Sequence, residues 1–182
     1  MSTPNNTEAE LEDISPAHEF NLNALHSYLS DTIGGFAGEL HVKQFTAGQS
    51  NPTFQLTAGN TQYVLRKKPP GELLPSAHAV DREFRVMAAL QNTSVPVPKT
   101  LVLCTDRNVI GTEFYVMTMV NGNVFQDPGL PGLTHTERTR FYESFIQALA
   151  SLHAIDPADV GLSDFGRPKG CLLYTSPSPR DS

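Results

Sequence analysis

The order of hydrophobic periodicities along the chain constrains its fold more than any single motif. Three short segments rich in β-branched and aromatic residues come first, at 41–46, 53–58 and 61–67. A helical repeat at 80–90 follows, and then two more strand-like segments, at 100–106 and 112–120. Short β-branched runs bounded by turn residues predict strands, whereas apolar residues three and four apart predict a helix. The chain therefore predicts an α+β domain, a five-stranded antiparallel sheet with one helix inserted after the third strand.

Two further helices flank this block. Leu22, Leu25 and Leu29 repeat at helical spacing before the first strand. Near the other end, Thr134 and Glu137 have the spacing of a capping box, in which each side chain satisfies a free backbone N–H of the first turn. The apolar face of that last helix carries Phe141, Phe145, Leu149 and Leu152. In the isolated chain we expect this face to be exposed or poorly packed.

These elements divide the chain of 182 residues into four parts. Residues 1–15 are polar and acidic, which predicts disorder. Residues 16–122 form the sheet-containing lobe, and 123–170 begin a helical lobe. Residues 171–182 have no periodicity and no relation to what precedes them, which favours read-through into foreign sequence over a natural disordered terminus.

The composition limits the classes of partner and of site. The net charge is -6 with a pI near 5.4, which argues against a nucleic-acid or anionic-membrane surface. We find no apolar run of the ~18 residues that a membrane span needs, nor a signal or transit peptide, so we expect a cytoplasmic or other intracellular protein. Cys104 and Cys171 are far apart and lack metal-ligand spacing, which predicts neither a zinc site nor a disulfide scaffold.

The loop between the first two strands is a candidate phosphate-binding loop. A backbone with a flexible glycine can approach anionic oxygens closely and offer N–H donors. The loop reads Gly48-Gln49-Ser50-Asn51, and the last two side chains could add donors. An ordinary turn is the alternative, because the loop does not match the G-x-G-x-x-G pattern.

A cation and a carboxylate stand where a phosphate clamp needs them. Arg66 ends the third strand, and strand alternation places it and Lys68 on one face and Lys67 on the other. Glu83 flanks the apolar face of the inserted helix, where a partly desolvated carboxylate would need a cation. The alternatives are a solvated cluster of charges on the strand, and a surface Glu83 paired with its neighbour Arg82 or Arg85.

The last strand passes into a glycine-containing linker, as Tyr115-Val116-Met117-Thr118-Met119-Val120-Asn121-Gly122. An apolar strand followed by exposed backbone can wall a purine and then offer it donors and acceptors. Met117 and Met119 could equally be core residues.

In order and spacing, these features are those of a protein-kinase-like small lobe followed by the first helix of a large lobe. The segments FTAGQSNPTFQL, YVLRKKPPGELLPSAHAVDREFRV, VPVPK and IGTEFYVMTMVNG resemble the aminoglycoside phosphotransferase (APH) family of kinase-like enzymes. Within it they resemble the branch at the N-terminus of acyl-CoA dehydrogenase family members 10 and 11.

The resemblance implies ATP-dependent phosphorylation of a small-molecule hydroxyl, in this branch on a hydroxyacyl-CoA, with an acyl-CoA dehydrogenase domain following. It implies phosphate contacts from Gly48, Gln49, Ser50 and Asn51. It also implies a cationic contact from Arg66, held by Glu83, and adenine contacts from the backbone of Thr118 and Val120.

The catalytic loop of such enzymes has no counterpart here. None of the six histidines is followed two positions later by aspartate, as the H-G-D loop of the family requires. The sequence Asp164-Phe165-Gly166 imitates a magnesium-binding motif but follows the last helix too closely to be one. We therefore expect an inactive N-terminal fragment that would need magnesium only in the full-length protein. The alternative is a non-catalytic nucleotide-binding or pseudokinase-type interaction module.

Overall fold

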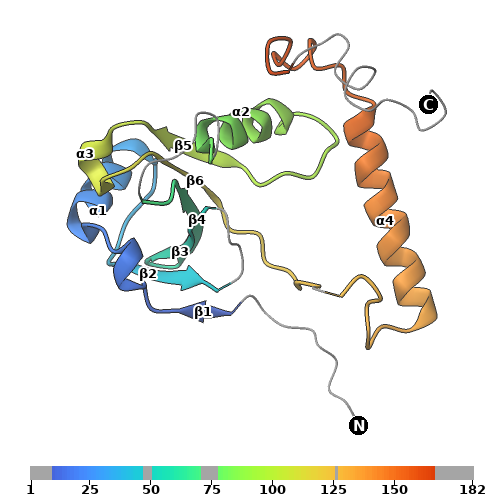
Figure 1. The fold of residues 1–182 in the computed structure, drawn as a ribbon, viewed down its shortest axis with the longest axis horizontal. Helices are drawn as coiled ribbons and strands as arrows, with labels where there is room; N and C mark the ends of the chain where they lie inside the picture. The colour runs from blue at the N-terminus through green and yellow to red at the C-terminus, as the bar shows by residue number, and fades with distance from the viewer. Residues whose placement is uncertain (1–9, 47–50, 71–77, 126, 167–182) are drawn as a thin grey trace, which may run out of the picture.

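A six-stranded antiparallel sheet forms the centre of the computed structural model (Figure 1), which describes residues 10–46, 51–70, 78–125 and 127–166. Its strands are β1 (Leu11–Glu12), β2 (Leu40–Phe45), β3 (Thr53–Ala58), β4 (Thr61–Lys67), β5 (Thr100–Cys104) and β6 (Phe114–Thr118). They lie in the order β1-β2-β3-β4-β6-β5. The helices are η1 (Pro16–His18), α1 (Leu22–Thr32), α2 (Val80–Leu90), α3 (Arg107–Ile110) and α4 (His135–His153). The predicted α+β class is confirmed.

The sheet has one strand more than predicted. Strand β1 pairs antiparallel with the end of β2, and beside it Lys43 donates to the carboxylate of Asp13 at 2.7 Å. The prediction of disorder over residues 1–15 is therefore wrong for residues 10–15. These residues gain ladder hydrogen bonds at the sheet edge, which their own polar composition does not reveal. Residues 1–9 and 171–182 lie outside the described residues.

One face of the sheet carries the hydrophobic core. Alternate residues of β3, among them Phe54 and Leu56, are fully buried on that face, where α1 contributes the equally buried Leu25 and Leu29. In Figure 1, α1 and α3 lie together on this side of the sheet. The opposite sheet face does not contribute to this core.

Helix α2 packs against β5 and β6. Its first and last residues, Val80 and Leu90, are buried. The side chain of Gln91 then fastens the helix end to β5, because its amide accepts from the Thr100 N–H at 3.0 Å and donates to the Thr100 hydroxyl at 2.8 Å. The helix that carries Glu83 is thus fixed to the sheet.

Helix α4 contrasts with α2 because none of its residues is buried. The predicted capping box between Thr134 and Glu137 is present. As expected, Phe145 and Leu149 are exposed, by 56% and 40%, while Phe141 is half-buried against Phe125. Among the described residues, no helix is both long and apolar enough to cross a membrane.

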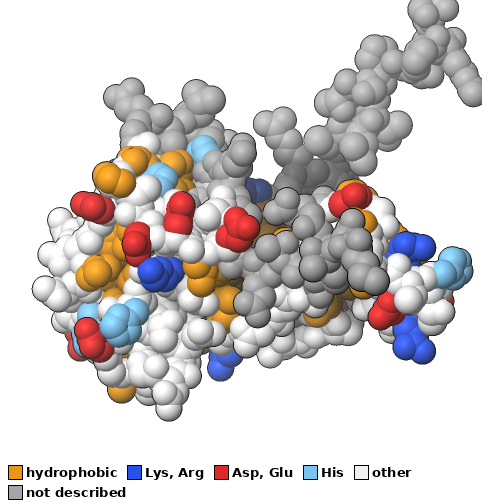
Figure 2. Space-filling model, turned by 90° about the horizontal axis from the view of Figure 1, so that it is seen from below, with side chains coloured by type: hydrophobic (Ala, Val, Ile, Leu, Met, Phe, Trp, Pro, Cys, Tyr) orange, Lys and Arg blue, Asp and Glu red, His pale blue; other side chains and the backbone are white. Residues whose placement is uncertain are grey.

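The segment after α4 returns to α2. Arg82 donates to the carbonyl of Phe165 at 2.8 Å and stacks on its ring, while Arg85 pairs with Asp164. These contacts give the Asp164-Phe165-Gly166 sequence a structural place on α2. In the orientation of Figure 2, basic and acidic side chains are interspersed over the visible face.

Candidate functional site

A cavity of about 660 Å³ opens on the sheet face opposite the core. Its floor is formed by the alternate residues of β3, β4 and β6 that point away from the core, and the chain after β6 closes one side. We call this closing segment, residues 119–124, the hinge. The residues that line the cavity include Thr53, Gln55, Val64, Arg66, Met117 and Met119.

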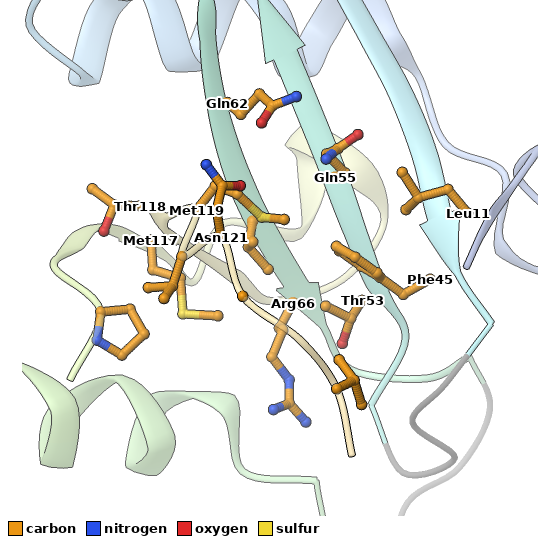
Figure 3. A pocket seen from close by; sticks show the side chains of 15 residues that line it. Leu11, Phe45, Thr53, Gln55, Gln62, Arg66, Met117, Thr118, Met119 and Asn121 are labelled. Atoms are coloured by element: carbon orange, nitrogen blue, oxygen red, sulfur yellow. The ribbon is translucent and has the colours of Figure 1, made fainter. Parts of the chain in front are cut away.

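The cavity is polar at its two ends and apolar between them. Figure 3 shows the Arg66 guanidinium at one end and the amides of Gln55, Gln62 and Asn121 at the other. Val64 and Met117 lie between the ends as neighbours in the β4–β6 register. This arrangement suits an elongated ligand with a flat apolar part and an anionic end.

The structure brings Arg66 and Glu83 together, as the sequence predicted. Arg66 Nε lies 3.5 Å from Glu83 Oε2, and each side chain is about one-third exposed. That nitrogen is buried, and among the described residues it has no hydrogen-bond partner. The contact is therefore a charge–charge proximity and not a directed hydrogen bond.

Both oxygens of the Glu83 carboxylate accept hydrogen bonds from neutral donors. Asn51 Nδ2 donates to Oε1 at 2.8 Å, and the Tyr115 hydroxyl donates to Oε2 at 2.9 Å. Tyr115 is 1% exposed, and its burial, followed by the negative charge of Glu83, raises the pKa of its hydroxyl well above the usual value. Tyr115 therefore remains a hydrogen-bond donor at physiological pH.

Asn51, the last residue of the predicted phosphate loop, makes its side-chain contacts within the protein. Its side chain is buried, with the Nδ2 on Glu83 and the Oδ1 accepting from His78 Nδ1 at 2.9 Å. Both ends of the amide are engaged within the protein, so the side chain bridges Glu83 and His78. The other predicted loop residues, Gly48, Gln49 and Ser50, lie outside the described residues.

The end of β6 shows how the backbone of Thr118 is used. Its N–H donates to the Lys99 carbonyl at 2.9 Å, so this donor is already engaged. In return the Lys99 N–H donates to the Thr118 hydroxyl at 3.1 Å, where a regular ladder would use the Thr118 carbonyl. The Thr118 hydroxyl thus replaces the Thr118 carbonyl as the acceptor for Lys99, which leaves the carbonyl without this ladder hydrogen bond. Val120, in the hinge, is 64% exposed.

Of the three consecutive cations at the end of β4, Arg66 faces the cavity. Lys67 points to the opposite face, is 4% exposed and lies 5.6 Å and 5.8 Å from the ring centroids of Phe20 and Phe54. Burial lowers the pKa of Lys67. Lys68 pairs with Glu113 at 2.6 Å.

Two contributors to the site were missed by the sequence reasoning, Tyr115 and His78. Tyr115 stands directly opposite Arg66 in the β4–β6 register, so knowledge of the register would have revealed it. His78 precedes α2 and carried no pattern of its own.

Asp164 is held by Arg85 and lies outside the set of residues that line the cavity. Among the described residues we find no group of three or more histidine, cysteine, aspartate or glutamate side chains that could hold a metal ion.

Comparison with known proteins supports the kinase-like fold. Residues 41–176 match the model of the phosphotransferase enzyme family, APH. A solved structure from Ralstonia eutropha, assigned by its description to the aminoglycoside phosphotransferases, is 43% identical with a TM-score of 0.73. The match covers 84% of this chain and 44% of that one.

Curated relatives are long proteins that this chain matches over a fraction of their length. Human acyl-CoA dehydrogenase family member 11 is 45% identical over 163 residues, or 87% of this chain and 21% of that protein. The probable acyl-CoA dehydrogenase IBR3 of Arabidopsis thaliana is 49% identical over 162 residues, or 85% and 20%. The chain thus spans about a fifth of the length of these relatives. With its kinase-like fold and its family match over most of its length, the chain belongs to the APH phosphotransferase family.

Proposed function

We propose that the cavity binds ATP and that the chain supplies the nucleotide-binding half of a small-molecule phosphotransferase. The observation that carries the proposal is the polarity of the cavity, with Arg66 at one end of an apolar slot. The adenine ring would lie against Val64 and Met117, which are neighbours on the cavity floor, and the phosphates would extend toward Arg66. A guanidinium suits this place because its planar fork can contact two phosphate oxygens.

The end of β6 and the hinge would together recognise the edge of the adenine. The Thr118 carbonyl, relieved of its ladder role by the Thr118 hydroxyl, would accept from the exocyclic amine. The backbone N–H of Val120, in the exposed hinge, would donate to a ring nitrogen. Both contacts use main-chain groups, in keeping with the apolar side chains around them.

Magnesium does not fit the described residues, because they offer no cluster of carboxylates near Arg66. We propose that the metal-binding carboxylates, and the aspartate that orients the attacking hydroxyl, belong to parts of the full-length protein beyond this chain. The contribution of this chain is then to hold the nucleotide and balance phosphate charge.

The acceptor that we propose is a hydroxyl group of a hydroxyacyl-CoA. Support comes from the relatives, which are described as acyl-CoA dehydrogenases and in which this region is about a fifth of the protein. A dehydrogenase domain on the same polypeptide would use the product or a close derivative. We propose an intracellular compartment, because ATP and acyl-CoA, the proposed substrates, are intracellular metabolites.

A thermal-shift titration with ATP tests the binding proposal. A ligand that binds the folded state raises the unfolding temperature. We expect such a rise for the wild type and its loss in Arg66→Met, with at least a tenfold weaker Kd. Arg140→Met, on the exposed surface of α4, serves as the matched control and should bind as the wild type does. No rise with ATP in the wild type would contradict the proposal.

The acceptor is tested on the full-length protein. We expect phosphate transfer from labelled ATP to a hydroxyacyl-CoA and none to the same acyl-CoA without its hydroxyl. Nucleotide binding with no transfer to any small-molecule hydroxyl would support the non-catalytic module instead.

A further inference from the structure

The Glu83 carboxylate is held by neutral groups more closely than by its cation. A carboxylate beside an arginine usually accepts two parallel N–H bonds from the guanidinium fork. Here Asn51 and Tyr115 already donate to its two oxygens, at 2.8 Å and 2.9 Å. The Nε of Arg66 lies 3.5 Å from Glu83 Oε2 and makes no hydrogen bond among the described residues. The fork of Arg66 is therefore not committed to Glu83.

We propose that Asn51 and Tyr115 are positioning residues that hold the Glu83 carboxylate away from the guanidinium fork of Arg66 and so keep that fork available for phosphate. This inference rests on the proposed ATP site. It adds the two residues that determine how much of the Arg66 guanidinium is available to a phosphate there. The carboxylate stays near enough to balance part of the positive charge. It does not compete with a phosphate for the same N–H donors.

The arrangement also links two parts of the chain around the cavity. Asn51 precedes β3, whereas its second partner, His78, lies just before α2. His78 adopts a φ of 56°, a conformation that few residues other than glycine tolerate, and its carbonyl accepts from the Val80 N–H at 2.9 Å. The hydrogen bond to Asn51 stabilises this conformation. Since Asn51 Oδ1 is the acceptor, His78 carries its proton on Nδ1.

Unfolding measurements without ligand test the geometry first. Two double-mutant cycles share Glu83→Gln, one with Tyr115→Phe and one with Arg66→Met. Because a hydrogen bond to a charged group outweighs a partly exposed ion contact, we expect a coupling of about tenfold in the folding constant for Tyr115–Glu83 and less than about threefold for Arg66–Glu83. The reverse ranking would overturn the proposal, whether or not nucleotide binds.

Ligand binding tests the consequence. We measure the ratio of the Kd for adenosine to the Kd for ATP, which reports the contribution of the phosphates. In Tyr115→Phe the freed Glu83 oxygen should pair with Arg66, and the ratio should fall about tenfold while adenosine affinity is unchanged. Tyr63→Phe removes a hydroxyl from another buried tyrosine on the neighbouring strand and should leave the ratio as it is.

A rescue separates positioning from general damage. Adding Glu83→Gln to Tyr115→Phe removes the competing charge, so the ratio should recover at least threefold. Equal losses for adenosine and ATP in Tyr115→Phe, or no recovery in the double variant, would overturn the proposal. A wild type that binds adenosine and ATP equally well would instead contradict the proposed ATP site, and the unfolding cycles would still decide the positioning role.

Discussion

Helices α2 and α4 reverse the expected relation between local signals and burial. Helix α2 is short, and its N-cap residue Ala79 offers no side-chain hydrogen bond, yet both its end residues are buried. Helix α4 has 19 residues and a complete capping box, and none of its residues is buried. Local sequence thus specifies where a helix forms, whereas tertiary contact decides how much it stabilises the fold.

The difference has a simple cause in packing. The partners of α2 are β5 and β6, which both follow it closely in sequence and form with it one lobe. The apolar side chains of α4, such as Phe145 and Ile146, have no comparable surface among the described residues. An amphipathic pattern indicates that one face of a helix favours burial, but it does not show which surface covers that face.

The largest expected effect is a difference in stability between two Leu→Ala substitutions, one in the core and one on α4. Leu65 is fully buried in β4, whereas Leu149 on α4 is 40% exposed. Leu65→Ala should lower the free energy of unfolding by about 2–5 kcal/mol, because it leaves a cavity in the core. Leu149→Ala should change it by less than about 0.5 kcal/mol. Urea denaturation followed by circular dichroism measures both, and similar losses would break the comparison.

An intermediate effect concerns the lysine inside the sheet lobe. Burial lowers the pKa of Lys67 in the folded state, while the unfolded chain keeps a value near 10.5. Between those two pKa values the unfolded state binds more protons, so stability should rise with pH across that window. Lys67→Met should abolish this rise. It should also increase the free energy of unfolding by ~1 kcal/mol at neutral pH, because removing the desolvation penalty of the buried ammonium outweighs the loss of its contacts with the aromatic rings.

The same variant gives a second readout. Desolvation, and then the nearby charge of Lys67, lower the pKa of His18. In Lys67→Met the pKa of His18 should move upward in an NMR titration. An unchanged His18 pKa, or a pH profile of stability like that of the wild type, would show that the lysine is not buried as a charge.

A smaller effect should come from the capping box of α4. Thr134→Ala removes the hydroxyl that accepts from the Glu137 N–H, a loss of about 1 kcal/mol in a helix terminus. Because α4 is weakly attached to the lobe, hydrogen exchange should quicken in its first turn while the urea midpoint of the sheet stays the same. A matching fall in that midpoint would show that α4 and the sheet unfold together.

The smallest effect on stability should come from charging the exposed stripe of α4. Ile146→Lys alters a side chain that is 61% exposed, so the free energy of unfolding should change by less than about 0.5 kcal/mol. Self-association, which an exposed apolar stripe promotes, should decrease in sedimentation velocity. Wild-type protein that is already monodisperse at high concentration would contradict this expectation.

The sequence predicted the elements whose signals are local. Strands β2 to β6 and helices α1, α2 and α4 follow from periodicity, β-branched residues and the capping box. Strand β1 escaped prediction because it has only two residues and depends on the edge of β2. The one-turn helix α3 was not predicted, although Asp106 caps it and Gly111 ends it with a φ of 84°.

In the candidate site, too, only the contacts that depend on local spacing could be predicted. The approach of Arg66 to Glu83 followed from strand and helix spacing. The hydroxyl of Tyr115 on Glu83 depends on the cross-strand register, and Arg85 finds Asp164 across 79 positions of sequence. Arg82 and Arg85 are the alternative partners that the sequence offers for Glu83. They bind Phe165 and Asp164 instead, which lie too far along the chain to be identified from neighbouring residues.

The contacts between α2 and the segment after α4 also set an order of events during synthesis. They join residues 76 to 83 positions apart, through Arg82 and Arg85. A chain growing from its N-terminus completes β2 to β6 by Thr118, before Gly161 or Phe165 has been added. The nascent sheet can therefore seat the helix that carries Glu83 first. The later residues then bind to a helix already in place, so the sheet and its cavity can form before the segment after α4 is synthesised.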